Sequence, residues 1–445
     1  MALTLFQSST AKVFGIAFLA LLMFIPLAQV QGLIGERSGL REQAVATIAQ
    51  RWGEPQRIGG PMLYIPRRIR ADTDKGVVIR DDGRDVVLPD RLEIHGTLAP
   101  DIRHYGIYET PVYTSELKIS GEFLAADLDK LKGADSWLWD QVELQLPIAD
   151  VRGIRRMSLL TFNGKDLRLG PANSTLGQFG AIATPVDLGR GATDAQDGRK
   201  YKFELNVTLA GTQNLSFLPL ARSTEVSLSS PWPDPNFDGA FLPTERRVNE
   251  QGFASTWSVL DLNRNFGQHW REGVQNSDNV AAAAFGVSLY QPASVYQQNV
   301  RAGKYGILFV ALTFVAFFLF EILRKLRVHP VQYLLVGVAL ITFYVVLLAL
   351  SEQIGFAWAY LAAAAVVVLM VGGYAAAVLN QWRAGLILGG MLAIVYALLY
   401  GLVVSEQYSL LMGAIALLAV VAALMYLTRR VDWYAYAAAK PLAAH

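Results

Sequence analysis

One short segment carries oxygen-bearing side chains at the spacing of a calcium-binding loop. Its acidic and amide residues are Asp234, Asn236, Asp238 and Glu245. Calcium takes several carboxylate and amide oxygens on a tight turn, and this spacing matches the EF-hand loop. An EF-hand also needs a helix on each side, which Pro231, Pro233 and Pro243 oppose. We therefore expect a rigid turn between strands, with no bound metal ion or other cofactor.

The same segment is rich in aromatic residues. They are Trp232, Phe237 and Phe241. Aromatic side chains on a surface anchor many protein interfaces. We therefore interpret 232–241 as an interaction loop.

The rest of the sequence offers no recognised catalytic arrangement. The chain has no cysteine, and its five histidines lack the HExxH spacing of a zinc protease. It also lacks the GxSxG nucleophile turn, the Walker loop and the glycine-rich dinucleotide fingerprint. We expect a protein that is not an enzyme. The alternative is a membrane-tethered hydrolase of glycan or lipid, which requires Asp234, Asp238 and Glu245 to converge.

Long apolar runs dominate the last third of the chain, and one more lies near its start. Six runs approach the roughly 20 residues that a helix needs to cross the hydrocarbon core: 13–30, 305–323, 331–350, 356–379, 384–404 and 408–427. The pattern predicts a multi-pass α-helical membrane protein with six transmembrane helices, a retained anchor at 13–30 and a five-helix bundle over 305–427. Residues 31–304 carry 31 basic and 33 acidic residues, and this balance gives no indication of nucleic acid binding.

The short connectors determine the expected orientation of these helices. The basic residues of the last third all fall on one side of the membrane: Arg324, Lys325, Arg327, Arg383, Arg429, Arg430 and Lys440. Basic residues favour the cytoplasmic side. We therefore expect a cytoplasmic N-terminus at 1–12, a cytoplasmic tail at 428–445 and a large periplasmic domain, in the bacterial inner membrane.

Two acidic residues follow predicted spans on the outer side, within the same tripeptide Ser-Glu-Gln. They are Glu352 and Glu406, 54 residues apart. One interpretation is a polar membrane pair in a transporter or channel. The other is a pair of turns in the headgroup region, where a carboxylate costs little. Gly385 and Gly389 form a GxxxG pattern, which indicates either a close contact between helices or a chance spacing of small residues.

The segment after the anchor has helical periodicity. Its apolar residues are spaced four apart: Leu40, Ala44, Ile48 and Trp52. This spacing predicts a helix within a juxtamembrane segment, 31–60, and Gly53 provides a helix stop.

Strand periodicity follows. Apolar and polar residues alternate, most clearly in 201–209, which indicates half-buried antiparallel strands. We expect a β-rich exported domain over 61–304. Two short sequence matches have nearly equal offsets: 92–98 resembles 203–209, and 114–119 resembles 223–228. They predict two tandem lobes, 61–170 and 200–300.

Several strings resemble the CreD family of bacterial inner membrane proteins. They include Gly60-Pro-Met-Leu-Tyr-Ile-Pro66, Trp232-Pro-Asp-Pro-Asn-Phe-Asp-Gly239 and His329-Pro-Val-Gln-Tyr333. The resemblance extends over nearly the whole chain and implies one anchor, a periplasmic domain and several further spans. It also implies a role in cell envelope integrity and envelope stress, with colicin tolerance and a response to β-lactams. No reaction is established for the family, so the resemblance implies no catalytic residues.

These observations favour a protein that acts by binding. We expect the exported domain to bind another envelope component, a protein or a glycan. The apolar helices hold that domain at the lipid bilayer.

Overall fold

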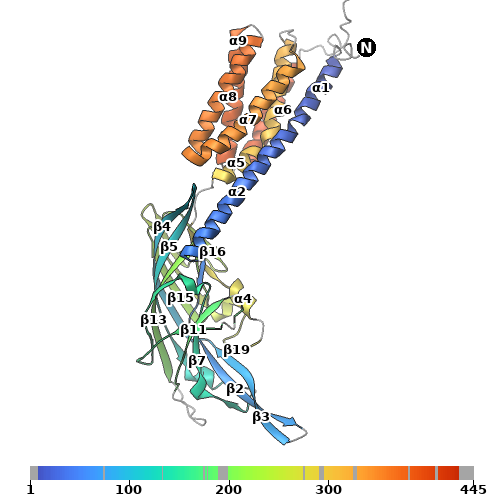
Figure 1. Ribbon diagram of the computed structural model, residues 1–445. Helices are drawn as coiled ribbons and strands as arrows, with labels where there is room; N and C mark the ends of the chain where they lie inside the picture. Colours follow the sequence, from blue (N-terminus) through green and yellow to red (C-terminus); the bar gives the residue numbers. More distant parts are fainter. Residues whose placement is uncertain are drawn as a thin grey trace, which may run out of the picture. The chain divides into compact units, whose positions relative to one another are not determined.

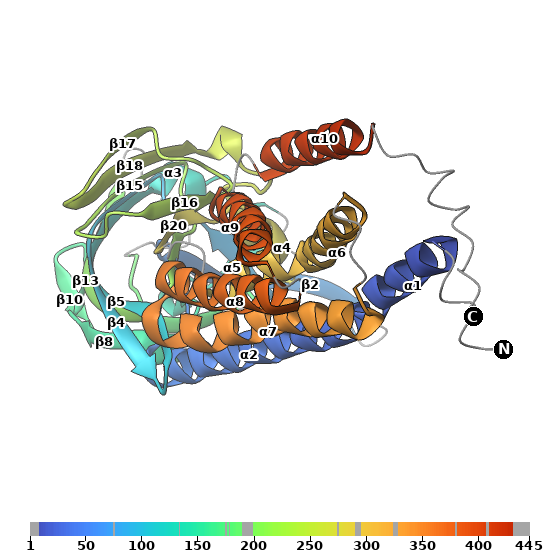
Figure 2. The same cartoon turned by 90° about the horizontal axis from the view of Figure 1, so that it is seen from above.

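The chain folds into two compact units in the computed structural model (Figures 1 and 2). The β-unit is Glu42–Gln291, and the helical unit combines Met1–Arg41 with Pro292–His445. The structure describes residues 9–73, 76–132, 134–173, 176–177, 179–188, 199–273, 276–289, 295–323, 328–378, 381–405 and 409–429. A large β-rich domain and a set of apolar helices are therefore both present, as the sequence predicts.

Described strands of the β-unit form a nine-stranded sheet in the order β10-β9-β13-β5-β4-β15-β18-β17, with β8 also paired to β13. The strands are β4 (Arg91–Tyr105), β5 (Tyr108–Leu124), β8 (Ile154–Met157), β9 (Leu160–Phe162), β10 (Lys165–Leu167), β13 (Lys200–Thr212), β15 (Ser223–Ser230), β17 (Glu245–Asn249) and β18 (Gly252–Leu260). Every second residue is buried along most of β13. This sheet therefore has one face in the core and one in solvent, as the alternation predicts.

The second sheet of the β-unit has eleven strands among the described residues, in the main order β16-β20-β14-β1-β7-β2-β3-β19. Its strands are β1 (Gln56–Ile58), β2 (Met62–Thr73), β3 (Gly76–Val87), β6 (Ser136–Trp137), β7 (Glu143–Ile148), β11 (Gly170–Ala172), β12 (Gly180–Pro185), β14 (Asn214–Phe217), β16 (Pro235–Gly239), β19 (His269–Arg271) and β20 (Phe285–Leu289). Leu63 and Ile65 face a core shared with the nine-stranded sheet. Met62 and Tyr64 pack on the opposite face, with Val280 of α4 (Ser277–Ala282). At this position the sheet is therefore covered on both faces.

Strands from the two segments expected as tandem lobes, 61–170 and 200–300, occur together in both sheets. β13 pairs with β5 along its whole length, and β15 runs parallel to β4. A duplicated hairpin would place β13 beside β15, as β4 lies beside β5, but β5 and β4 separate them. The β-unit therefore has one shared core instead of two lobes.

Helix α2 (Phe24–Trp52) ends where the β-unit begins its strands. Gly53 has a φ of +146°, which only glycine adopts without strain. A Cβ at this position would lie 2.4 Å from the carbonyl oxygen of Ala210. The indole N–H of Trp52 donates to the carbonyl oxygen of Tyr113 at 3.2 Å, which fixes the last turn of the helix. The helix stop predicted at Gly53 is confirmed.

Within the described residues, four helices are long and apolar enough to cross a membrane: Phe14–Trp52, Pro330–Ile354, Phe356–Val378 and Trp382–Val404. The pair Val295–Lys304 and Gly306–Ile322 adds a fifth if it is one span bent by 45°. The last expected span, 408–427, contributes a shorter apolar helix, Leu411–Ala423. The structure thus supports four or five of the six expected spans.

The helices of the helical unit pack through small residues where α8 meets α9. The helices are α1 (Ser9–Leu22), the start of α2, α5 (Val295–Lys304), α6 (Gly306–Leu323), α7 (Pro330–Ile354), α8 (Phe356–Val378), α9 (Trp382–Val404) and α10 (Ser409–Thr428). Helix α8 contacts both α7 and α9 (Figure 2). A Cβ at Gly385 would lie 2.5 Å from the Gly372 carbonyl oxygen and 2.5 Å from the Ala376 Cβ. Small residues let helix backbones approach closely, so Gly385 and Gly389 form a helix contact.

We expect the change Gly385→Leu to destabilise the helical unit by about 1–3 kcal/mol, because the larger side chain must push α8 and α9 apart. Gly390→Leu is the matched control on the same helix, since a Cβ at Gly390 meets nothing within 4 Å. An SDS-unfolding titration in mixed micelles should show a lower midpoint for Gly385→Leu alone. Equal midpoints for the two variants would contradict this close contact.

Candidate binding groove

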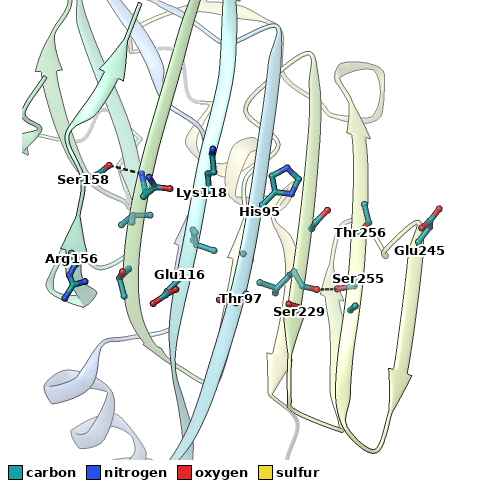
Figure 3. Close-up of a pocket in the computed structure, with 18 of the residues that line it drawn as sticks. His95, Thr97, Glu116, Lys118, Arg156, Ser158, Ser229, Glu245, Ser255 and Thr256 are labelled. Carbon is teal, nitrogen blue, oxygen red and sulfur yellow. Dashed lines mark hydrogen bonds between the residues drawn. The ribbon is translucent and has the colours of Figure 1, made fainter. Parts of the chain in front are cut away.

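The exposed face of the nine-stranded sheet carries a groove of about 890 Å³ (Figure 3). A second hollow of about 550 Å³ adjoins it, and Thr97, Ser229 and Arg247 line both. The second hollow extends to Pro231, at the start of the predicted interaction loop. Together they form one continuous hollow.

Strand register aligns one row of side chains across the groove. From β17 to β13 the row reads Glu245, Thr256, Ser227, His95, Lys118 and Asn206. Directly paired residues point to the same face of a sheet. The alternate residues Ile94 and Trp257 point into the core, which leaves this row on the solvent side.

A second row on the same face lies two residues away from the first on each strand. From β17 to β8 it reads Arg247, Ala254, Ser229, Thr97, Glu116, Thr208 and Arg156. Figure 3 shows Arg156 at one end of the groove and Glu245 at the other, with His95 and Thr97 between them. The groove therefore crosses seven strands.

The exposed side chains of the groove lining are hydroxyl, amide, imidazole and charged groups, apart from Ala254. Its lining contains no phenylalanine, tyrosine or tryptophan among the described residues. Lys118 pairs with Glu204 of the neighbouring strand at 2.9 Å. The Ser158 hydroxyl accepts the backbone N–H of Asn206 at 3.0 Å, which fixes one wall. Such a surface suits reversible binding of a polar ligand.

The calcium-like string is divided between the two sheets. Asp238 lies in β16 of the eleven-stranded sheet, where its carboxylate accepts hydrogen bonds from the Asn214 amide at 3.2 Å and from the Ser288 hydroxyl. Glu245 lies in β17 of the other sheet, at the edge of the groove, while Asp234 and Asn236 are exposed. In the part of the chain that the structure describes, no three acidic or histidine side chains are placed to hold a metal ion.

The aromatic residues of the predicted interaction loop are partly buried against the core. The Phe237 ring meets the Trp257 ring edge to face at 5.8 Å, and the Phe241 ring meets the Phe285 ring at 5.9 Å. The Trp232 indole N–H donates to the Asp234 carbonyl oxygen at 3.1 Å. These rings therefore have packing roles, and contact with a partner stays a prediction.

The C-terminal end of α7 carries one acid of the predicted polar membrane pair. The Glu352 carboxylate accepts a hydrogen bond from the Tyr296 hydroxyl of α5 at 2.9 Å. The Asn299 amide, also on α5, donates to the Ser351 hydroxyl at 2.9 Å. Glu406 lies outside the described residues, so the pairing of the two acids stays a prediction.

The sequence did not predict the groove. Asn206 and Thr208 were expected only as the solvent-facing positions of a strand. The available signal was the composition of these positions on β15, where Ser227 and Ser229 take the place of longer charged residues. That signal becomes specific only when the neighbouring strands are known.

Comparison with known proteins supports one family. The sequence profile described as inner membrane protein CreD matches residues 8–434. The inner membrane protein CreD of Escherichia coli strain K12 is 34% identical over 426 residues, covering 94% of this chain and 92% of that protein. Among solved structures, an M1 zinc metallopeptidase of Deinococcus radiodurans is 14% identical over 39% of each chain with a TM-score of 0.20, which is too low to indicate a common fold. The chain belongs to the CreD family of inner membrane proteins.

Proposed function

We propose that this inner membrane protein supports the integrity of the cell envelope and the response to envelope stress. It does so by binding another envelope component through its β-unit. The proposal extends to tolerance of colicins and β-lactams, which the family resemblance implies. Its support is the family membership together with an open, polar groove on a large extramembrane β-unit.

The proposed topology places this groove in the periplasm. Six helices cross the membrane: the anchor 13–30 and five within 305–427, with both termini in the cytoplasm. Support comes from the basic residues of the connectors and tail, Arg383 and Arg429 among them, which share one side in this arrangement. The groove then faces the compartment that contains the proposed partner.

The groove is the single observation that carries the binding function. It offers hydroxyl and charged groups from seven strands, and the cross-strand pairs of the sheet hold those groups in fixed register. An arrangement fixed in advance loses little conformational freedom when a ligand binds.

The spacing of the groove's two carboxylates favours binding over glycan hydrolysis. Glu116 lies on β5 and Glu245 on β17, four strand spacings apart along the sheet. At about 4.8 Å per strand the separation is roughly 19 Å. The acid pairs of glycosidases are separated by about 5 to 9.5 Å. These two groups are therefore too far apart to act together on one glycosidic bond.

We expect the change Ser229→Trp to remove envelope protection, because the indole fills the middle of the groove. The measurement is survival under a β-lactam of cells that lack the native gene and express the variant. Ser258→Trp is the matched control, since Ser258 is also an exposed strand serine but does not line the groove. Both variants should reach the membrane in normal amounts. Full protection by Ser229→Trp would rule out the groove as the contact site.

A further inference from the structure

We propose that the ligand of the groove is an extended anionic glycan, bearing carboxylate or phosphate groups. This inference rests on the proposed function, because it takes the same groove as the binding site. Three features carry it: the cations at the two ends of the groove, the distance between them and the chemistry of the floor.

Arginines lie at both ends of the groove. Arg156 on β8 lines one end, and Arg246 and Arg247 on β17 line the other. Among the described residues, no carboxylate lies within ion-pair distance of any of the three. Guanidinium groups match the geometry of carboxylate and phosphate, and each can donate two parallel hydrogen bonds to them. The groove therefore offers anion-binding groups that no carboxylate of the described residues engages.

The distance between the two ends requires a long ligand. Six strand spacings separate β8 from β17, in the order β8-β13-β5-β4-β15-β18-β17. At about 4.8 Å per spacing, the path along the sheet is roughly 29 Å. A ligand that reaches Arg156 and Arg247 together must be an oligomer with acidic groups along its length.

The floor between the arginines favours a sugar chain over a protein. Its exposed and partly exposed side chains include the hydroxyls of Thr97, Ser227, Ser229 and Thr256, which donate and accept hydrogen bonds. Protein interfaces usually depend on aromatic or aliphatic anchors, and small-molecule pockets are mostly apolar. Among the described residues this groove contains no aromatic side chain, and its larger aliphatic side chains Leu117, Val207 and Leu228 are buried. A polyhydroxylated chain satisfies the hydroxyls without requiring apolar contact.

Two carboxylates also line the groove, so some substitutions should strengthen the binding of an anionic ligand and others should weaken it. The lining contains four basic residues, Lys118, Arg156, Arg246 and Arg247, against two acidic ones, Glu116 and Glu245. Lys118 is engaged by Glu204, so the arginines at the ends provide the free positive charge. Glu116 lies between them and opposes an anionic ligand. Removal of Glu116 should therefore strengthen binding, whereas removal of an arginine should weaken it.

The test measures binding of defined oligosaccharides to the full chain in nanodiscs by isothermal titration calorimetry. The probes are hexagalacturonate, which bears carboxylates, a phosphomannan oligosaccharide, which bears phosphates, and neutral maltohexaose. We expect at least one anionic probe to bind about tenfold or more tighter than maltohexaose, since charge-assisted hydrogen bonds are each worth about one such factor. The stronger anionic probe identifies the acidic group. Equal affinity for all three probes, or binding of none, overturns the proposal.

Three variants assign the effect to the groove. Arg156→Gln combined with Arg247→Gln should weaken the anionic probe by about tenfold or more, and Glu116→Gln should strengthen it. Arg168→Gln, an exposed arginine outside the groove, should change nothing. Unchanged affinity in the double arginine variant contradicts the proposal, as does weaker binding in Glu116→Gln.

The two proposals fail in different ways. If Ser229→Trp removes protection in cells but no anionic probe binds, the groove is the contact site and the ligand class is wrong. If an anionic probe binds as expected but Ser229→Trp protects normally, the ligand class holds and the proposed function fails.

Discussion

Replacing Trp257 by alanine is expected to lower the free energy of unfolding of the β-unit by about 3–5 kcal/mol, the range for truncating a large buried aromatic. Trp257 is 0% exposed and belongs to the core between the two sheets. Its ring packs on Phe237 at 5.8 Å and on Phe285 at 5.9 Å. Its removal leaves a cavity that close-packed neighbours fill only in part.

The measurement is a urea titration of the detergent-solubilised protein, followed by the β-sheet signal in circular dichroism. Leu262→Ala is the control, because Leu262 is 88% exposed and its truncation should change stability by less than about 0.5 kcal/mol. A midpoint for Trp257→Ala equal to that of the control would show that this tryptophan does not lie in a packed core.

The elements that sequence predicts well are those set by local periodicity. The alternation in 201–209 places β13, and the four-residue spacing before Trp52 places the end of α2. Gly53 ends that helix because its φ of +146° suits glycine alone. Apolar length predicts α7, α8 and α9, because the hydrocarbon thickness sets the length of a span.

The arrangement of strands depends on contacts far apart in the chain, which periodicity does not contain. β15 pairs with β4, so Ser227 lies beside His95 although 132 residues separate them. Because register decides which polar positions become neighbours, the groove was not predicted. The two expected lobes rested on local similarity between strands, and such similarity arises wherever strands alternate.

Two candidate calcium ligands named from the sequence, Glu245 and Asp238, lie in extended strands of different sheets. Glu245 does line the groove, but as a strand residue instead of a calcium ligand. Asp238 is held by Asn214 and Ser288, so its carboxylate serves the packing of β16 on β14 and β20. A spacing motif identifies ligands only where the backbone curls around an ion, and here the backbone is extended.

The second large effect concerns which side of the membrane the β-unit occupies. The chain has no cysteine, so single-cysteine variants can be labelled without background. Lys165 is exposed in β10 of the β-unit, and Lys165→Cys leaves the groove lining intact. We expect nearly complete labelling of Lys165→Cys in intact cells. Basic connectors favour the cytoplasmic side, and the proposed topology puts the β-unit on the other side of the membrane.

The most direct test of the account compares Lys165→Cys with His445→Cys, using a maleimide that does not cross the inner membrane. We expect Lys165→Cys to react in intact cells, whereas His445→Cys should react only after the inner membrane is permeabilised. The opposite pattern, with His445→Cys labelled in intact cells and Lys165→Cys protected, would place the groove in the cytoplasm and contradict a role at the envelope.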